Sequence, residues 1–119
     1  MDTPINSNDF LATVDATIER LMRKNKLNAN YLAGELGLHP QHMRRLLRQT
    51  TGMSSADYIT SIKIGRAKEL LIEHDLLAVA KVGYLCGYDE ATHFTRFFRN
   101  VVGMTPSEYR AKHRKTAYN

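Results

Sequence analysis

The sequence predicts an all-α fold of about seven helices, with two helix-turn-helix subdomains joined by a long linker helix. Apolar residues recur at helical spacing along almost the whole chain, whereas the sustained alternation typical of strands is absent. Prolines and glycines stand where helices commonly begin and end. The motif "GMSSADY" at 52–58 returns as "GMTPSEY" at 103–109, which indicates an internal repeat.

The composition narrows the class of protein. The 119 residues include 17 Lys and Arg against 12 Asp and Glu, for a formal net charge of +5. The basic residues concentrate in "MRRLLRQ" (43–49), "TRFFRN" (95–100) and "YRAKHRK" (109–115). A basic excess placed in this way suits a phosphate-rich partner. Cys86 is the only cysteine, so an intramolecular disulfide is excluded and a cysteine-based metal site nearly so.

We expect a cytoplasmic protein with no membrane partner, for two reasons. No stretch approaches the roughly 18 to 20 apolar residues that would span a bilayer. The beginning of the sequence, "MDTPINSNDF", lacks the basic start and the apolar core of a signal peptide.

Residues 1–27 are predicted to form an N-terminal extension and a leading helix. Asn8 or Ser7 is a suitable N-cap for this helix, and Asn25 and Asn28 break it. The apolar stripe of the helix consists of Phe10, Leu11, Val14, Ile18, Leu21 and Met22.

Residues 28–53 are predicted to form the first helix-turn-helix unit. A short helix over about 29–36 stops at Gly37. Pro40 fits the first turn of the next helix, where its missing N–H costs nothing, and that helix ends near Gly52. The apolar face of the second helix consists of Met43, Leu46 and Leu47.

Residues 54–75 are predicted to form the linker helix. Ser54 and Asp57 give the S-x-x-D capping pattern, and apolar positions at helical spacing persist to about His74. Gly65 lies inside this helix and should weaken it by roughly 1 kcal/mol relative to alanine. Some 20 residues at a rise of 1.5 Å span roughly 30 Å, which is close to the roughly 34 Å between successive major grooves on one face of B-DNA.

Residues 76–113 are predicted to form the second helix-turn-helix unit. A short helix over about 79–86 stops at Gly87. The next segment, "YDEATHFTRFFRN" (88–100), is predicted as a helix capped by Asp89. Its apolar face consists of Phe94, Phe97 and Phe98, which stand at i, i+3 and i+4.

A final helix is predicted within the second unit. Thr105, Pro106 and Glu108 combine an N-cap, a proline at the first helical position and a capping-box acid. The helix is expected to run to about His113, and residues 114–119 to form a frayed tail.

The second helix of each unit has the same design, with polar residues opposite the apolar face. Gln41, Arg45 and Arg48 in the first unit correspond to Thr92, Arg96 and Arg99 in the second. Because a helix-turn-helix places its second helix in the DNA major groove, this repeated pattern predicts that the chain binds double-stranded DNA through two reading helices.

The chain resembles the DNA-binding domain of AraC/XylS-type bacterial transcription regulators. The resemblance is carried by "LAGELGL", "HMRRLLRQTTGMS", "GRAKELL" and "VGYLCGYDEATHFTRFFRNVVGMTPSEYR" and covers about residues 28–111. The leading "NDFLATVDATIERLM" is similar to the helix that precedes this domain in hybrid two-component regulators, so the chain is expected to be the C-terminal output domain of such a protein. The resemblance implies a seven-helix, two-subdomain fold that binds promoter DNA and recruits RNA polymerase, usually for activation.

The resemblance also implies base-reading roles for positions on both second helices. They are Gln41, Arg44 and Arg45 in the first unit and Ala91, Thr92, His93, Thr95 and Arg96 in the second. Arg45 and Arg96 are the strongest candidates, because a guanidinium can bind guanine O6 and N7 with two hydrogen bonds. Ala91 can do no more than touch a thymine methyl group.

A second group of residues is expected to hold phosphates, which gives affinity without sequence information. They are Arg48, Lys63, Arg66, Arg99, Thr105, Arg110 and Lys112. Thr105 belongs to this group because helix N-termini favour phosphate, although plain capping is the alternative there.

Other classes of function are less well supported. No motif for a nucleophile or a P-loop is present, and the five histidines lack paired metal-ligand spacing, so we expect no enzyme, no metal and no cofactor. A helical protein-interaction module that binds an acidic partner is an alternative. The twofold repeat of the outward arginines argues against it, because the surface of a protein partner does not repeat about every 34 Å as the DNA major groove does. RNA binding ranks last, because exposed aromatics are missing. The domain is expected to be monomeric in isolation, with any dimerisation through regions outside it.

Overall fold

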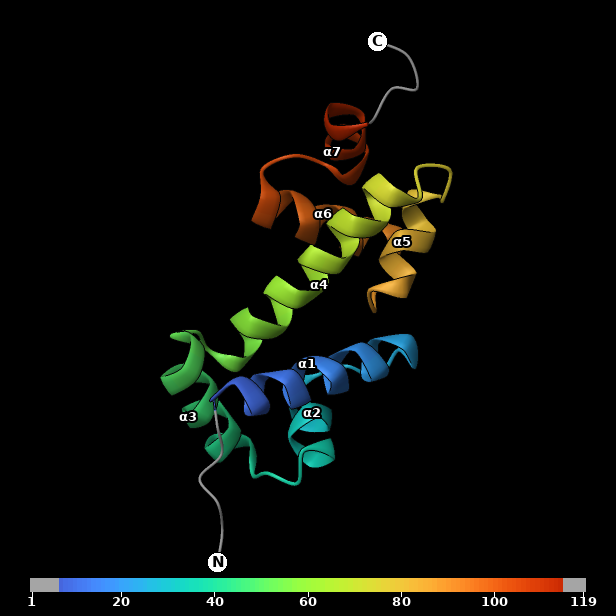
Figure 1. Ribbon diagram of the computed structural model, residues 1–119. Coiled ribbons are helices and arrows are strands. Elements are labelled where there is room, and N and C mark those ends of the chain that lie inside the picture. Colours follow the sequence, from blue (N-terminus) through green and yellow to red (C-terminus); the bar gives the residue numbers. More distant parts are fainter. Residues whose placement is uncertain (1–6, 115–119) are drawn as a thin grey trace, which may run out of the picture. The chain divides into compact units, whose positions relative to one another are not determined.

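The computed structural model describes residues 7–114, and this part of the chain contains seven α-helices and no strand (Figure 1). The predicted all-α fold is confirmed. The predicted extension up to residue 6 and the tail from residue 115 lie outside the described residues. The helices are α1 (Ser7–Arg23), α2 (Ala29–Glu35), α3 (Pro40–Thr51), α4 (Ser55–Glu73), α5 (Val79–Leu85), α6 (Ala91–Val102) and α7 (Pro106–His113).

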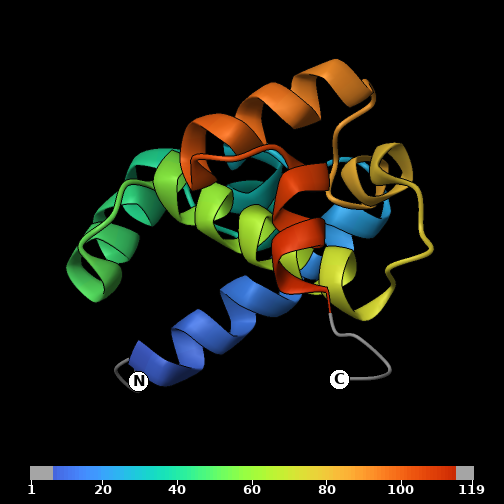
Figure 2. The same ribbon diagram turned by 90° about the horizontal axis from the view of Figure 1, so that it is seen from above.

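The helices form two compact units, and the boundary between them falls inside α4. Unit 1 ends at Ile62 and unit 2 begins at Lys63. The first half of α4 therefore packs in unit 1 with α1–α3, and the second half packs in unit 2 with α5–α7. Each unit contains one helix-turn-helix pair, α2–α3 in unit 1 and α5–α6 in unit 2 (Figures 1 and 2).

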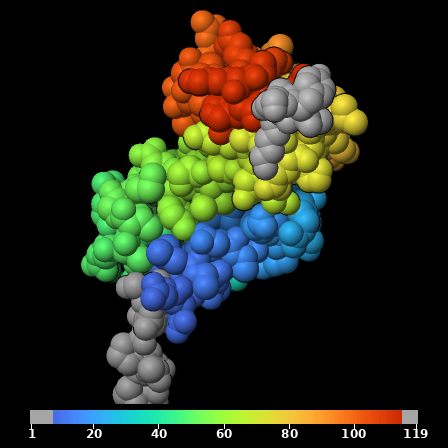
Figure 3. Space-filling model, turned by 45° about the horizontal axis from the view of Figure 1, so that its top comes forward, coloured from blue at the N-terminus to red at the C-terminus, as the bar shows by residue number. Residues whose placement is uncertain are grey.

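The core of unit 1 is mainly aliphatic. Val14 and Ile18 of α1 meet Leu32 of α2 and Met43 and Leu47 of α3, and all five are fully buried. The opposite side of α1 faces solvent, as the blue surface in Figure 3 shows. The apolar faces predicted for α1 and α3 thus pack together with α2 in this core.

Side chains cap both helices of the α2–α3 pair. The Asn28 side chain accepts a hydrogen bond from the Tyr31 N–H at 2.8 Å. His39 Nδ1 accepts one from the Gln41 N–H at 3.2 Å. The turn between the helices passes through Gly37 in the left-handed region (φ 70°), where glycine is the least strained residue.

The core of unit 2 is built on aromatic rings. Phe94 and Phe98 of α6 are buried, with ring centroids 5.8 Å apart. The ring centroids of Tyr88 and Phe97 are 5.0 Å apart. The ring of Tyr109 in α7 packs edge-on against that of Phe98, with their centroids 5.6 Å apart. These contacts fix the rotation of α6 about its axis, because turning it would expose the rings.

Gly83 makes room for one of these rings. A Cβ atom at this position would lie 2.6–2.8 Å from three atoms of the Phe94 side chain. Real contacts of this kind are essentially never so short, so α5 can approach α6 this closely only because residue 83 has no side chain. The equivalent position in unit 1 is Ala33, and the residue equivalent to Phe94 there is the more flexible Met43.

Of the capping predictions at Ser54, Asp89 and Thr105, the first and the last are confirmed and the second is wrong. Ser7 and Asn8, the two residues suggested as the cap of the first helix, both lie inside α1. The Asp57 N–H donates to Ser54 Oγ at 3.1 Å, and Thr105 and Glu108 form a reciprocal capping box. The helix expected to be capped by Asp89 instead has Glu90 at its N-cap, with no side-chain hydrogen bond to the cap. The turn of unit 2 is one residue longer than that of unit 1, which displaces the helix start.

None of the helices in the described part of the chain has the length and apolar character needed to cross a membrane.

Candidate nucleic-acid interface

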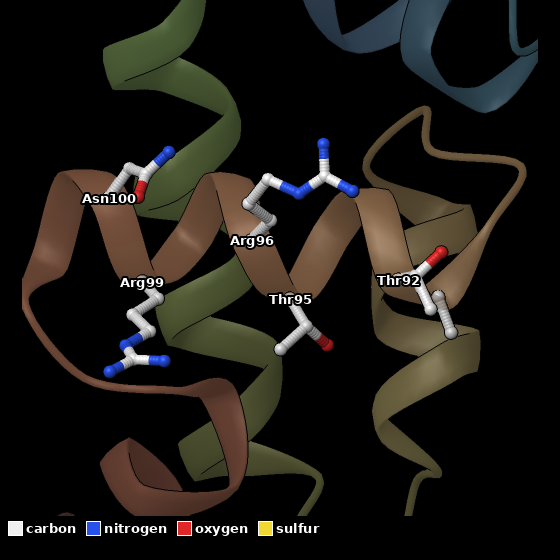
Figure 4. Close-up of a pocket in the computed structure, with 6 residues that line it drawn as sticks. Thr92, Thr95, Arg96, Arg99 and Asn100 are labelled. Carbon is white, nitrogen blue, oxygen red and sulfur yellow. The ribbon is translucent and has the colours of Figure 1, made fainter.

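The outer face of α6 is a polar, basic surface with a shallow hollow. Ala91, Thr92, Thr95, Arg96, Arg99 and Asn100 line the hollow. Figure 4 shows two rows along the helix, with Arg96 and Asn100 on one edge and Thr95 and Arg99 on the other. Both rows combine a hydrogen-bonding side chain with a guanidinium, which suits a surface that must meet both base edges and phosphates.

The equivalent surface of unit 1 is the outer face of α3. Gln41, Arg44, Arg45 and Arg48 are all exposed. Met43 and Leu47, on the opposite side of the helix, are fully buried. The packing of α3 therefore directs its arginines outward in the way predicted from the sequence.

The two strongest base-reading candidates are available for a ligand. Both Arg45 and Arg96 are exposed, and among residues 7–114 neither has an ion-pair partner. A guanidinium held this way on a helix can offer both of its donor edges to a guanine.

His93 lies at the N-terminal end of the α6 surface and is engaged with an acidic neighbour. Its Nδ1 is 3.3 Å from Glu90 Oε1, and both side chains are more than half exposed. This interaction leaves the Nε2 edge of the ring for another partner. Glu90 was not among the residues predicted from the sequence, although its spacing of three from His93 is a signal for a pair on one helix.

The predicted phosphate contacts differ in how exposed they are. Arg48, Arg99 and Lys112 are exposed. Arg66 forms an ion pair with Glu69 at 3.5 Å, and its side chain is nearly half exposed. Lys63 is partly buried, with Nζ 4.9 Å from the centre of the Tyr88 ring, and burial lowers the pKa of its ammonium group. Of these five basic residues, Lys63 is thus the least available to a phosphate.

The prediction for Arg110 is wrong, because this residue supports the fold. Its side chain is buried, with Nε donating to the Leu71 carbonyl at 2.9 Å and a terminal nitrogen donating to the His74 carbonyl at 3.1 Å. Arg110 therefore attaches α7 to the C-terminal end of α4, where the helix dipole favours a cation.

Thr105 has the capping role that is the alternative to a phosphate contact at this position. Its N–H donates to Glu108 Oε1 at 2.8 Å, and its hydroxyl accepts from the Glu108 N–H at 3.1 Å. These hydrogen bonds hold the pKa of the Glu108 carboxyl below its usual range. The resulting negative charge at the start of α7 would repel a phosphate.

Within residues 7–114, no group of three or more His, Cys, Asp and Glu side chains is placed to hold a metal ion.

Two helix-turn-helix pairs, each with a buried apolar side and a basic outer side on its second helix, define a DNA-binding domain. The profile of a family described as a helix-turn-helix domain matches residues 32–112. The chain belongs to this family, in the AraC-type group of bacterial transcription regulators. It is a sequence-specific DNA-binding domain of such a regulator.

Individual relatives agree with this assignment. The chain is 32% identical over 120 residues to the HTH-type transcriptional activator RhaR of Enterobacter sp. (strain 638), a match that covers 98% of this chain and 41% of that protein. It is 32% identical over 81 residues to the HTH-type transcriptional regulator GadX of Escherichia coli O6:H1, covering 68% of this chain and 29% of that protein. The chain thus spans less than half the length of these curated relatives.

Solved structures share the fold. The C-terminal domain of AraT, a response regulator from Geobacillus stearothermophilus, superposes with a TM-score of 0.80 at 24% identity, covering 92% of this chain and 89% of that one. The DNA-binding domain of the global transcriptional factor AdpA, in complex with a target DNA, superposes with a TM-score of 0.73 at 26% identity, covering 86% and 90% of the two chains.

Proposed function

We propose that this chain is the output domain of a bacterial transcription activator and that it places α3 and α6 in successive major grooves of one asymmetric promoter site. The observation that supports this most strongly is the repeat of the basic outer face. Both second helices carry an exposed arginine pair, Arg45 with Arg48 and Arg96 with Arg99, directly opposite a buried apolar side. One chain would then read two half-sites, which many helix-turn-helix proteins do as dimers.

The length of α4 is compatible with this arrangement. Its 19 residues correspond to roughly 28 Å at the rise of an α-helix, against roughly 34 Å for one turn of DNA. We therefore expect two sequence boxes about one helical turn apart.

Base reading is assigned to the outer faces of both helices. Arg45 and Arg96 bind guanines, and each such bidentate contact is worth about 1–3 kcal/mol of discrimination. The other contacts to base edges come from Gln41, Arg44, Thr92, His93 and Thr95.

Phosphate binding is assigned to cations beside these faces. Arg48, Arg66, Arg99 and Lys112 are the proposed contacts, with a lesser share for the partly buried Lys63. Each phosphate contact that is removed should reduce the slope of log affinity against log salt by about 0.9 without changing the preferred sequence.

Fluorescence anisotropy with promoter duplexes tests the proposal. We expect Arg45→Ala and Arg96→Ala each to weaken binding to the preferred duplex by about tenfold or more, while binding to unrelated duplexes changes far less. The matched control is Arg23→Ala, which removes an exposed arginine from the last turn of α1. Equal affinity for all duplexes, or tighter binding to an acidic protein than to DNA, would contradict the proposal.

The action of the whole regulator is proposed on the same basis. We propose that the bound domain recruits RNA polymerase in the cytoplasm and that the isolated domain is a monomer, with any dimerisation through other parts of the protein. Transcription in vitro from a promoter that carries the selected site, with and without the protein, measures the first point. Light scattering of the isolated domain measures the second.

A further inference from the structure

The start of α6 contains an acidic side chain in an otherwise basic surface. Glu90 occupies the N-cap position with extended backbone angles (φ −116°, ψ 132°). Ser, Thr, Asp and Asn are the residues usually found there, because their short side chains bond to the first amides of the helix. The Glu90 side chain makes no such hydrogen bond and is 65% exposed. Glu90 therefore contributes little to starting the helix.

Glu90 is instead paired with a side chain of the reading helix. The imidazole Nδ1 of His93, one turn further along, lies 3.3 Å from the carboxylate Oε1. This contact restrains the carboxylate at the N-terminal end of the α6 surface, and the second carboxylate oxygen remains available to a further donor.

A carboxylate in this position has an electrostatic cost when DNA binds. The phosphates of the duplex repel it, and a carboxylate can only accept hydrogen bonds. Within the major groove the edge of cytosine itself offers the N4 amino donor and no acceptor, and this amino group is the one that Glu and Asp side chains bind. Adenine also has an amino group, but its adjacent N7 is an acceptor, which suits an amide better than a carboxylate.

We propose that Glu90 is a specificity-determining residue that selects a cytosine at the base pair facing the start of α6, with His93 holding its carboxylate in place. This inference rests on the proposed placement of α6 in the major groove. It gives Glu90 two effects of opposite sign, since the carboxylate lowers the affinity for DNA in general and raises the preference for one base.

Selection of bound duplexes from a random pool, followed by affinity measurements, tests this proposal. We expect the wild-type domain to select a cytosine at one position of the box read by α6. Glu90→Gln keeps the size of the side chain but replaces an acceptor pair with an amide, so it should shift that position to adenine. Glu90→Ala should reduce the preference for cytosine at that position by about tenfold or more. Both variants should bind unrelated duplexes more tightly than the wild type.

A second carboxylate provides the matched control. Glu35 is an exposed acid at the end of α2, paired with Arg20, and Glu35→Gln changes the net charge by the same amount. We expect this variant to keep the wild-type preference at every position. Circular dichroism of all variants checks that the helices are intact.

The outcomes separate this inference from the proposed function. If the wild-type domain selects a two-box site but the Glu90 variants keep its preferences, or gain affinity equally for every duplex, then Glu90 does not read a base and only this inference is overturned. If the wild-type domain selects no sequence at all, the proposed function fails with it.

Discussion

The two helix-turn-helix units have the same design but are stabilised in different ways. In unit 1, the side chains of Asn28 and His39 cap both helices of the pair, and the core is aliphatic. In unit 2, the equivalent caps, at Ala78 and Glu90, make no side-chain hydrogen bond. Unit 2 compensates with a cluster of aromatic rings. The same supersecondary structure can thus be stabilised mainly by local hydrogen bonds or mainly by tertiary packing.

This difference has a consequence for the reading helices. The start of α3 is fixed by a cap that its own sequence supplies, whereas α6 is positioned chiefly by the rings beneath it. Substitutions in the core should therefore have larger effects on α6, and substitutions at caps larger effects on α3.

The largest effect is expected from Phe98→Ala in unit 2. Its ring contacts the rings of both Phe94 and Tyr109, and truncation of a buried phenylalanine costs about 3–5 kcal/mol of unfolding free energy. Urea unfolding followed by circular dichroism measures the loss, and amide signals in NMR spectra locate it. If the amide signals of unit 1 disappear at a lower urea concentration than those of unit 2, the result would contradict the view that this ring stabilises unit 2.

A smaller effect is expected from Gly83→Ala. The added methyl group would overlap the Phe94 side chain, and overpacking of this kind costs about 1–3 kcal/mol. The double variant with Phe94→Met, which restores the pairing seen in unit 1, should recover part of the loss. Gly34→Ala is the control, since no atom lies within 4 Å of the added Cβ and alanine favours the helix by about 1 kcal/mol. Thermal unfolding measures these effects. A melting temperature of the Gly83→Ala variant at or above that of the wild type would disprove the close fit between Gly83 and Phe94.

Exchanging the caps of α2 and α5 tests the comparison from the other side. Asn28→Ala should destabilise unit 1 by about 1 kcal/mol, and Ala78→Asn should stabilise unit 2 by a similar amount. The hydrogen-exchange rates of the amides in the first turns of α2 and α5 measure the change in stability of each unit separately. If Asn28→Ala leaves the exchange of α2 unchanged, its cap does not stabilise unit 1.

The smallest perturbation uses the natural thiol of unit 2 as a probe. Burial raises the pKa of Cys86 to about 11, so below this pH the thiol is mostly protonated as well as enclosed. A thiol reagent at pH 8 should therefore label the folded protein very slowly and the urea-unfolded protein at once. Rapid labelling of the folded protein would show that the aromatic core opens readily.

Periodicity in the sequence was enough to predict the helices and their buried sides. Phe94 and Phe98 are buried and Arg96 is exposed because side chains three and four residues apart share a face of a helix. The caps at Ser54 and Thr105 were equally predictable, since a cap depends on residues within one turn.

What the sequence did not predict depends on contacts between distant segments. Arg110 was expected at the surface, but the carbonyls that bind it belong to residues 39 and 36 positions earlier in the chain. The fit of Gly83 to Phe94 likewise joins two helices. The cap of α6 is a different case, because the repeat that pairs Gln41 with Thr92 also aligns Glu90 with His39, the N-cap of α3, and so indicates Glu90 over Asp89.

The most direct test of the proposed DNA-binding mode is a selection from a random duplex pool with the wild-type domain and two single variants, Arg45→Ala and Arg96→Ala. We predict that the wild type selects two boxes about one helical turn apart, that Arg45→Ala loses the preference in one box, and that Arg96→Ala loses it in the other. A wild-type motif with a single box, or the loss of the same positions in both variants, would contradict the assignment of one reading helix to each unit.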